Sequence, residues 1–212
     1  MIYLIRHGSV ENPGDISYGR MPLPLSAKGK KEMKDLCRML KDRKITFDAI
    51  FSSPVKRALE SVEIIKGLFG AAALEIRDEI NDVDIGRLEG APMQILREAK
   101  YSEETLLEMR FEIESKAAMI DRTGRFVEEV KEKHQGKTVA FVTHGDICRL
   151  ILWSLVHPEQ KPPRIIKDAD YLGVAEAVVL RFDGDNFSGY EFIRRMQGSE
   201  VEKDNISRTE AY

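Results

Sequence analysis

The sequence predicts an α/β protein of three layers, in which helices cover both faces of a largely parallel central sheet. Short apolar runs typical of buried strands alternate with longer segments whose apolar residues recur at helical spacing. The chain has 212 residues, of which 42% are hydrophobic, enough for one substantial core. We therefore expect a single domain over residues 1–196, followed by a polar tail over residues 197–212.

The elements are expected to alternate along most of the chain and to end in a hairpin. The clearest strand is the run TVAFVT, and the turn Asp-Gly-Asp-Asn at 183–186 is typical of a tight hairpin. The predicted bounds are strand 1–5, loop 9–24, helix 26–43, strand 49–51, helix 54–69, strand 74–76, a helical stretch 92–134, strand 138–143, helix 146–156 and strands 177–182 and 190–193.

Composition excludes several classes of partner. The formal charge of −3 gives no basic face for a nucleic acid. No run approaches the roughly 18 apolar residues of a membrane span, and the N-terminal apolar run is too short for a signal peptide.

The two cysteines, Cys37 and Cys148, lie in apolar helical patterns, where we expect no disulfide. A cytoplasmic protein is the expectation.

Polar residues end three of the predicted strands. They are Arg6, His7 and Gly8, then Ser52, Ser53 and Pro54, and finally His144 and Gly145. Ligands of such sheets bind beyond the carboxyl ends of the strands, so we expect these residues to share one site. Arg57, in the first turn of the helix after Pro54, adds a second cation.

This combination suits phosphoryl transfer. That reaction needs a nucleophile in line with the leaving oxygen and positive donors around the phosphoryl oxygens. Arginine stays charged and matches phosphate geometry, and glycines such as Gly8 and Gly145 let phosphate approach backbone N–H groups. The sequence therefore predicts a phosphate site.

Four motifs in a fixed order extend this interpretation over residues 1–156. They are Ile5-Arg6-His7-Gly8, Ser52-Ser53-Pro54-Val55-Lys56-Arg57, the run from Ile80 to Gly90, and Val142-Thr143-His144-Gly145, with Tyr18-Gly19-Arg20 and the run from Pro24 to Gly29 beside them. The set resembles the histidine phosphatase superfamily, the phosphoglycerate-mutase-like group. The tripeptide alone is a weak signal, whereas four motifs in order are a strong one.

The resemblance implies a role for each matching residue. His7 is the nucleophile, while Arg6, Arg57 and a charged His144 hold the phosphoryl group. Neighbouring arginines depress the pKa of His7 and so keep its attacking nitrogen unprotonated. Asp82 aligns with the carboxylate that protonates the leaving oxygen. The implied activity is a metal-independent phosphatase acting through a phosphohistidine.

Two departures from the family pattern stand out. Asp82 replaces the more usual glutamate and is one methylene shorter, so Asp84 and Glu79 are alternative acids. In the first loop, Val10 stands where many members have Thr or Ser, and Pro13 stands where many have Asn. Asn12 and Arg20 are the expected substrate contacts in that loop.

Each residue also has a simpler interpretation. A lone histidine after a strand is usually structural, Arg57 is able to pair with Glu60 on a solvated helix face, and Asp82 suits a turn. The joint presence of the motif residues favours catalysis. His134 and His157 are expected to lie at the surface or to cap helices. Four scattered histidines without ligand spacing predict neither a metal site nor a cofactor.

Two other functions compete with hydrolysis of a phosphate monoester. A cofactor-dependent phosphoglycerate mutase uses the same residues, and a weakly catalytic module binds a phosphorylated ligand without turnover. The substrate is a small phosphorylated metabolite; the resemblance leaves sugar phosphates, phosphoglycerates, nucleotides and the ribazole phosphate of cobalamin synthesis open. Residues 9–24 and 91–118 are expected to set specificity. The apolar final strands offer an edge for pairing in a homodimer.

Overall fold

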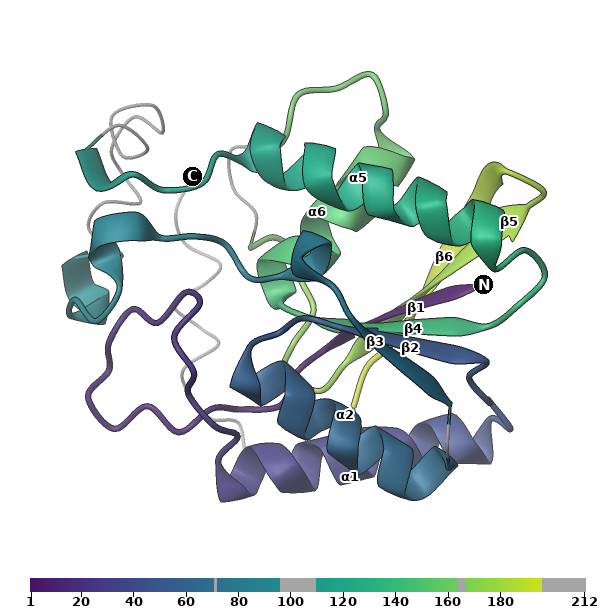
Figure 1. The fold of residues 1–212 in the computed structure, drawn as a ribbon, viewed down its shortest axis with the longest axis horizontal. Coiled ribbons are helices and arrows are strands. Elements are labelled where there is room, and N and C mark those ends of the chain that lie inside the picture. The colour runs from purple at the N-terminus through teal and green to yellow at the C-terminus, as the bar shows by residue number, and fades with distance from the viewer. Residues whose placement is uncertain (71, 96–109, 164–166, 196–212) are drawn as a thin grey trace.

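The computed structural model describes residues 1–70, 72–95, 110–163 and 167–195, and these form three layers around one six-stranded sheet (Figure 1). The strands lie in the order β3-β2-β4-β1-β5-β6. Their bounds are β1 Ile2–Arg6, β2 Ala49–Ser52, β3 Ala73–Ile76, β4 Val139–Thr143, β5 Ala177–Asp183 and β6 Asn186–Ile193. The helices are α1 Ala27–Asp42, α2 Lys56–Phe69, α5 Lys116–Lys133 and α6 Gly145–Val156, with the short 3₁₀ turns η1 Asp78–Ile80 and η2 Gly86–Leu88.

The sheet is mostly parallel, as predicted. Strand β4 pairs in parallel with β1 and β2, and β2 pairs in parallel with β3. Strand β5 runs antiparallel to β1, and β6 returns antiparallel to β5 through the predicted tight turn. That turn pairs Asp183 with Asn186, so β6 begins four residues earlier than the sequence pattern indicated.

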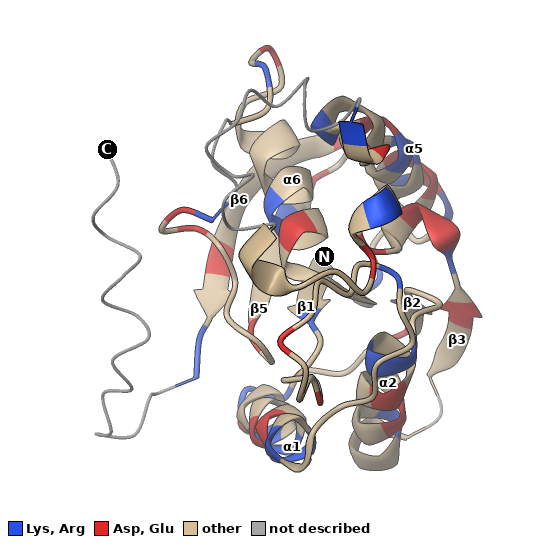
Figure 2. Ribbon diagram, turned by 90° about the vertical axis from the view of Figure 1, so that its left-hand side faces the viewer, with Lys and Arg blue, Asp and Glu red and all other residues tan. Residues whose placement is uncertain are grey.

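Successive side chains of the central strands enter two separate cores, because neighbouring residues of a strand point to opposite faces. Ile2 and Leu4 pack with residues of α5 and α6, whereas Tyr3 and Ile5 pack with residues of α1 and α2. Figure 2, turned so that the left side of Figure 1 faces the viewer, shows α1 and α2 on one side of the sheet and α5 and α6 on the other. Strands buried on both faces explain the near-continuous apolar runs in the sequence.

The helical stretch predicted over 92–134 is wrong as one helix. Glu112 has a positive φ of 58°, a conformation that a helix interior does not allow. Ser115 then caps a new helix, α5, by accepting a hydrogen bond from the backbone N–H of Ala118 at 3.1 Å. Residues 96–109, within the predicted stretch, and the predicted tail at 197–212 lie outside the described residues.

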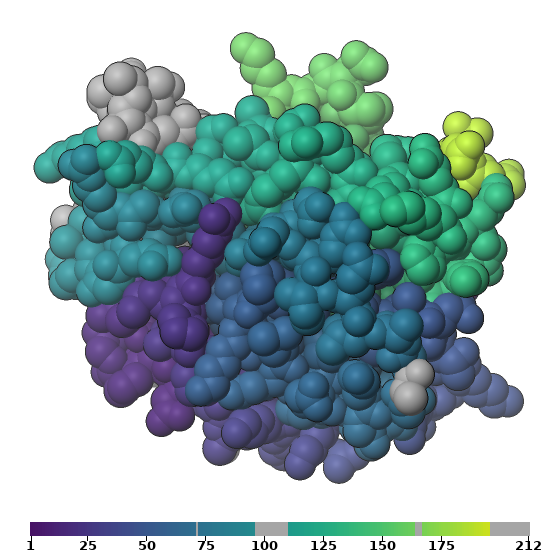
Figure 3. Space-filling view, viewed as in Figure 1, coloured from purple at the N-terminus to yellow at the C-terminus, as the bar shows by residue number. Residues whose placement is uncertain are grey.

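The first loop packs against a segment far away in sequence. Backbone N–H groups of Ser17, Gly90 and Met93 donate to carbonyls of Ala91, Ser17 and Asp15, each at 2.8 Å. In the space-filling view the purple first loop accordingly lies against the blue-green segment that contains Gly90 (Figure 3). The loop is therefore tied to the chain around η2 and forms one wall beside the ends of the parallel strands.

Both cysteines are buried free thiols, as expected. Within the described ranges, none of the helices is both long enough and apolar enough to span a membrane.

Candidate active site

The three strand ends converge because β1, β4 and β2 are neighbours in the sheet. Their register places Arg6 opposite Thr143 and Ser52 opposite Val142. The backbone N–H of His7 donates to the Thr143 carbonyl at 3.0 Å, which continues the ladder one residue beyond β1. The residues that follow the three strands therefore lie side by side, as the sequence predicted.

His7 is buried, and its hydrogen bonds define its tautomer. Nδ1 lies 2.7 Å from the Gly8 carbonyl oxygen, which can only accept, so Nδ1 carries the proton. Nε2 is then unprotonated, and its lone pair accepts a hydrogen bond from Arg57 Nε at 3.2 Å. Burial lowers the pKa of His7 well below its ordinary value, and the nearby His144, Arg57 and Arg6 lower it further. Nε2 is thus unprotonated and lies near the positive charges of Arg57 and Arg6.

Arg57 joins three parts of the site. Its side chain is fully buried at the start of α2. Besides His7, the guanidinium donates to two backbone carbonyls of the first loop, Gly19 at 2.5 Å and Met21 at 3.0 Å, and to Asp82 Oδ2 at 2.6 Å. Only one of these acceptors is charged, so the guanidinium keeps attraction for an incoming anion.

Arg6 lies at the end of β1 with little to neutralise it. One of its terminal nitrogens donates to the carbonyl of Leu172 at 2.7 Å, and its guanidinium stacks 5.1 Å from the ring centre of Tyr171. Its Nε is buried and has no hydrogen-bond partner among the described residues. A buried unpartnered donor is costly, and a phosphoryl oxygen would satisfy it.

Asp82 is the carboxylate that faces these cations. Oδ2 lies 2.6 Å from Arg57 and 3.2 Å from His144 Nδ1, although the latter pair is not aligned as a hydrogen bond. Burial acts to raise the pKa of Asp82, but His144 and Arg57 outweigh it, so the pKa lies below its ordinary value. The free protein therefore holds Asp82 as a carboxylate.

The two alternative acids are occupied elsewhere. Asp84 is half-exposed, accepts from Arg20 at 3.2 Å and caps the backbone N–H of Gly86 at 2.9 Å. Both oxygens of Glu79 accept from Arg77, at 2.9 and 3.0 Å. Asp82 is the candidate of the three that contacts Arg57 and His144.

His144 completes the cluster from the end of β4. Its ring centre lies 5.1 Å from that of His7, and its Nε2 is 2.8 Å from Ser53 Oγ. Burial lowers the pKa of His144 below its ordinary value, although Asp82 opposes this. The charged form of His144 that the resemblance implies is thus disfavoured in the free protein.

The two predicted glycines have packing reasons of their own. A Cβ on Gly8 would collide with the backbone carbonyl of Gly29 in α1, and one on Gly145 would collide with the hydroxyl of Tyr171. Glycine is therefore required at position 8, where the collision is with backbone, whereas a side chain at position 145 would displace the Tyr171 ring.

Asn12 and Arg20, the predicted substrate contacts of the first loop, both make hydrogen bonds within the protein. The Asn12 amide exchanges two hydrogen bonds with the backbone of Ile16, so its described bonds stay within the first loop. Arg20 contacts the main chain of the segment that carries Asp82, and its Nε donates to the backbone carbonyl of Asp82 at 3.0 Å.

Three residues beside the site were missed in the sequence. Tyr18 stacks 5.0 Å from the guanidinium of Arg57, and the hydroxyl of Tyr171 donates to Asp146 Oδ1 at 2.6 Å. Tyr18 precedes the Gly19-Arg20 motif and Asp146 follows Gly145, so both had a motif as a signal. Tyr171 had none, because it reaches Arg6 only through the tertiary fold.

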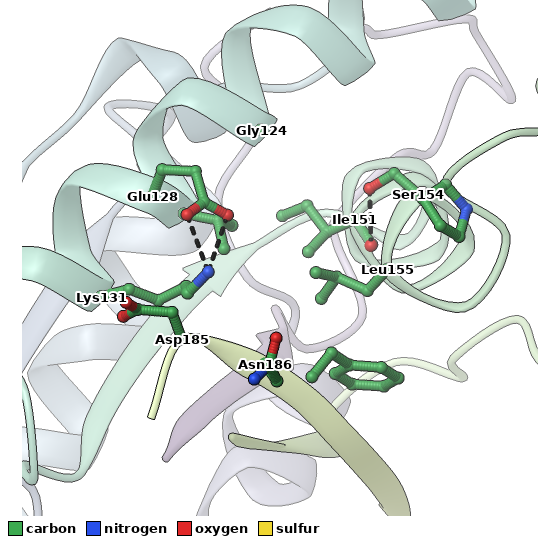
Figure 4. Close-up of a pocket in the computed structure, with 11 residues that line it drawn as sticks. Gly124, Glu128, Lys131, Ile151, Ser154, Leu155, Asp185 and Asn186 are labelled. Carbon is green, nitrogen blue, oxygen red and sulfur yellow. Dashed lines mark hydrogen bonds and ion pairs between the residues drawn. The ribbon is translucent and has the colours of Figure 1, made fainter. Parts of the chain in front are cut away.

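A separate hollow of about 350 Å³ lies between α5, α6 and the β5–β6 turn (Figure 4). It holds the ion pair of Lys131 with Glu128, and Asn186 and Ile151 also line it. None of the catalytic candidates lines this hollow. Across the described ranges, no three His, Cys, Asp or Glu residues are grouped to hold a metal ion.

Comparison with known proteins places this geometry in a family. The chain is 27% identical to the "Uncharacterized phosphatase PhoE" of Bacillus subtilis (strain 168), over 78% of this chain and 83% of that protein. It is 33% identical to "Phosphoserine phosphatase 1" of Hydrogenobacter thermophilus, over 73% of this chain and 75% of the relative. Matching relatives also include phosphoglycerate mutases.

The fold has close counterparts among solved structures. The structure titled "Bacillus stearothermophilus YhfR" superposes with a TM-score of 0.74, covering 88% of this chain and 93% of the other, at 22% identity. The family model of the histidine phosphatase superfamily (branch 1) matches residues 2–190. The chain belongs to the histidine phosphatase superfamily, branch 1.

Proposed function

We propose that the protein is a metal-independent phosphomonoesterase that hydrolyses a small phosphate ester through a phosphohistidine on His7. The observation that carries this proposal is the state of the His7 ring. Nδ1 is fixed as a donor to Gly8, and the unprotonated Nε2 faces Arg57 inside a buried cationic cluster. A nucleophile at that position is ready to attack an anion that the same cations attract.

The reaction proceeds in two displacements. His7 Nε2 attacks phosphorus, an N–P bond forms and the ester P–O bond breaks, while the Asp82 carboxyl gives its proton to the leaving oxygen. Asp82 then takes a proton from water, the water oxygen attacks phosphorus, and the N–P bond breaks to release inorganic phosphate. Arg6 and Arg57 stabilise the charge on the phosphoryl oxygens in both steps.

The low pKa of Asp82 fits this cycle once the substrate is considered. A phosphate dianion beside Arg57 and His144 offsets the charges that hold the carboxyl ionised. The pKa of Asp82 therefore rises as substrate binds, and the carboxyl takes up the proton that it later donates. In this state the His144 ring donates a hydrogen bond to a phosphoryl oxygen.

The first experiment is release of phosphate from para-nitrophenyl phosphate in the presence of EDTA. We expect activity in the wild type and its loss in His7→Ala, with His157→Ala, a histidine outside the site, as the matched control. Activity that disappears with the chelator, or that survives in His7→Ala, contradicts the proposal.

A phosphoglycerate mutase is the second candidate, because relatives of that activity match the chain. Hydrolysis is favoured by the modest length of chain between Gly90 and Lys137, where a mutase closes its site with additional residues. Formation of 2-phosphoglycerate from 3-phosphoglycerate faster than free phosphate would reverse this preference. Tight phosphate binding without any turnover would support the binding module instead.

The natural ester is best sought among the substrates of relatives. Names of related proteins include a phosphoserine phosphatase and a glucosyl-3-phosphoglycerate phosphatase. Phosphoserine, phosphoglycerates, sugar phosphates and nucleotides form the first panel, ranked by kcat/KM. A substrate at least tenfold better than the others identifies the ester class.

A further inference from the structure

Asp82 is held at its backbone as well as at its carboxylate. Its carbonyl oxygen accepts from Arg20 Nε at 3.0 Å and from an Arg122 terminal nitrogen at 3.3 Å. Its backbone N–H donates to Asn81 Oδ1 at 2.8 Å. Two guanidinium groups on one carbonyl, from the first loop and from α5, leave this peptide little freedom to turn.

Arg122 ties the segment before Asp82 to helix α5. It donates to the carbonyl of Glu79 at 2.6 Å and to both oxygens of Glu114, at 2.7 and 3.0 Å. The neighbouring carbonyl, that of Ile80, accepts from Thr143 Oγ1 of β4 at 2.6 Å. The turn η1 is therefore fixed between α5 and the end of the strand that carries His144.

Glu114 connects the two arginines. Its Oε2 accepts from Arg20 at 3.1 Å as well as from Arg122, and the backbone of Glu114 bonds that of Asp84 at 2.8 Å. Arg20 also pairs with the Asp84 carboxylate at 3.2 Å. The group of Arg20, Arg122, Glu114 and Asp84, here called the clamp, thus joins three segments that are distant in sequence.

The charges of the clamp cancel. Two arginines and two carboxylates give no net charge, so the clamp fixes the Asp82 backbone without adding a positive field that would further oppose protonation of the carboxyl. The rigidity matters because aspartate is one methylene shorter than glutamate. Its carboxyl position depends on the backbone, and a misplacement of about 1 Å can cost roughly 100-fold in rate.

We infer that the clamp positions Asp82 as the general acid, and that Arg122 is a positioning residue for proton transfer to the leaving group. This inference rests on the proposed function, since it assigns Asp82 the proton that leaves with the ester oxygen. Arg122 acts through Asp82, whereas the arginines that bind phosphate act on the phosphoryl group itself. Its effect must therefore depend on how much acid help the leaving group needs.

The test compares leaving groups. In Arg122→Met we expect kcat to fall roughly 10- to 100-fold for an alkyl phosphate such as glycerol 2-phosphate. The fall for 2,4-dinitrophenyl phosphate, whose leaving group needs no proton, is expected to be at least tenfold smaller. Arg122→Lys keeps one donor and should recover part of the loss. Equal losses for both substrates overturn the inference.

Two further variants isolate the route of the effect. Arg77 is the matched control, because its side chain is 16% exposed against 14% for Arg122 and it also binds carboxylates beside η1. Arg77→Met should leave the leaving-group ratio unchanged. In an Asp82→Asn background, Arg122→Met should have no additional effect on the alkyl phosphate, and a further loss there contradicts positioning through Asp82.

A readout without turnover separates this inference from the proposed function. Asp82 raises the pKa of His144, so a displaced Asp82 lets that pKa fall further. NMR titration should show the His144 ring titrating at lower pH in Arg122→Met than in the wild type, with no change in Arg77→Met. An unchanged His144 titration overturns the clamp even if the wild type is active. A wild type without phosphatase activity but with the shift overturns only the proposed function.

Discussion

Arg57 and Arg77 are both held by several hydrogen bonds, but their surroundings differ. Arg77 binds three carboxylates, Glu75, Glu79 and Glu129, and its side chain is 16% exposed. Hydrogen bonds to these carboxylates raise the pKa of Arg77. Hydrogen bonds from Arg77 and Lys133 lower the pKa of Glu129 to about 2. Arg57 is fully buried, yet it binds one carboxylate, one imidazole and two peptide carbonyls.

We expect this difference to separate a structural arginine from one that binds a ligand. A guanidinium surrounded by carboxylates has its charge neutralised already and gains little from another anion. Arg57 has a single carboxylate, and Arg6 contacts a carbonyl and an aromatic ring, so both retain positive charge near His7. The number of carboxylates around each arginine therefore distinguishes the neutralised Arg77 from the incompletely neutralised Arg57.

The largest difference in kcat/KM should appear when each of these two arginines is replaced in turn by methionine. Arg57→Met is expected to lower kcat/KM about 1,000-fold, because it removes charge from the transferring phosphoryl group. Arg77→Met should change kcat/KM less than about threefold, since surface-type ion pairs contribute little. Steady-state kinetics with para-nitrophenyl phosphate measure both. Similar losses of kcat/KM in the two variants would contradict the distinction between Arg57 and Arg77.

The next effect concerns the carboxylates beside these arginines. Asp82→Asn is expected to lower kcat for an alkyl phosphate by about 100-fold or more, as general acid catalysis is typically worth 10²–10⁴. Asp84→Asn should lose far less, because Asp84 serves the clamp and not the leaving oxygen. A greater loss in Asp84→Asn, measured on the same ester, would transfer the role of acid to Asp84.

A smaller effect is expected from phosphate binding to the free site. At about 100 times its dissociation constant, inorganic phosphate should stabilise the fold by about 2.7 kcal/mol, or roughly 5 to 10 °C in Tm for a domain of this size. Arg6→Met should lose most of this shift, and Arg77→Met should keep it. Differential scanning fluorimetry at matched ionic strength measures both shifts in Tm, and a full shift in Arg6→Met contradicts phosphate binding by Arg6.

The smallest effect is on stability against pH. Burial lowers the pKa of His7 and of His144 below the ordinary value of 6.5, so the unfolded chain binds these protons first. The free energy of unfolding therefore has its highest value above about pH 6.5. It falls as the pH drops, by at most about 1.4 kcal/mol per pH unit for each histidine. Urea unfolding of His7→Asn between pH 7 and 4.5 should show a shallower slope, and an identical slope contradicts a neutral buried His7.

Much of the site could be predicted because it follows from the sheet. His7, Ser53 and His144 each come directly after an apolar strand, and the parallel register of β1, β2 and β4 brings them together. The helix that begins at Lys56 then directs Arg57 to the same point. Local pattern and strand order were sufficient for these residues.

The remaining residues depend on tertiary contacts that no periodicity records. Tyr171 and Leu172 reach Arg6 from a segment without regular structure, and Arg122 on α5 reads as an ordinary polar helix residue. Arg20 was expected to contact the substrate, and the fold places its Nε on the Asp82 carbonyl. Sequence showed that Arg20 accompanied the motifs, whereas only the fold shows which side of Asp82 it occupies.

The most direct test of the central claim is to trap the covalent intermediate. The protein is mixed with a ³²P-labelled phosphate ester, quenched in alkali within milliseconds and digested, and the labelled peptide is sequenced. We expect a label that is stable in alkali, labile in acid and confined to His7, and its absence in His7→Ala. Turnover of the ester without any labelled His7, or a label on another residue, would contradict the phosphohistidine mechanism.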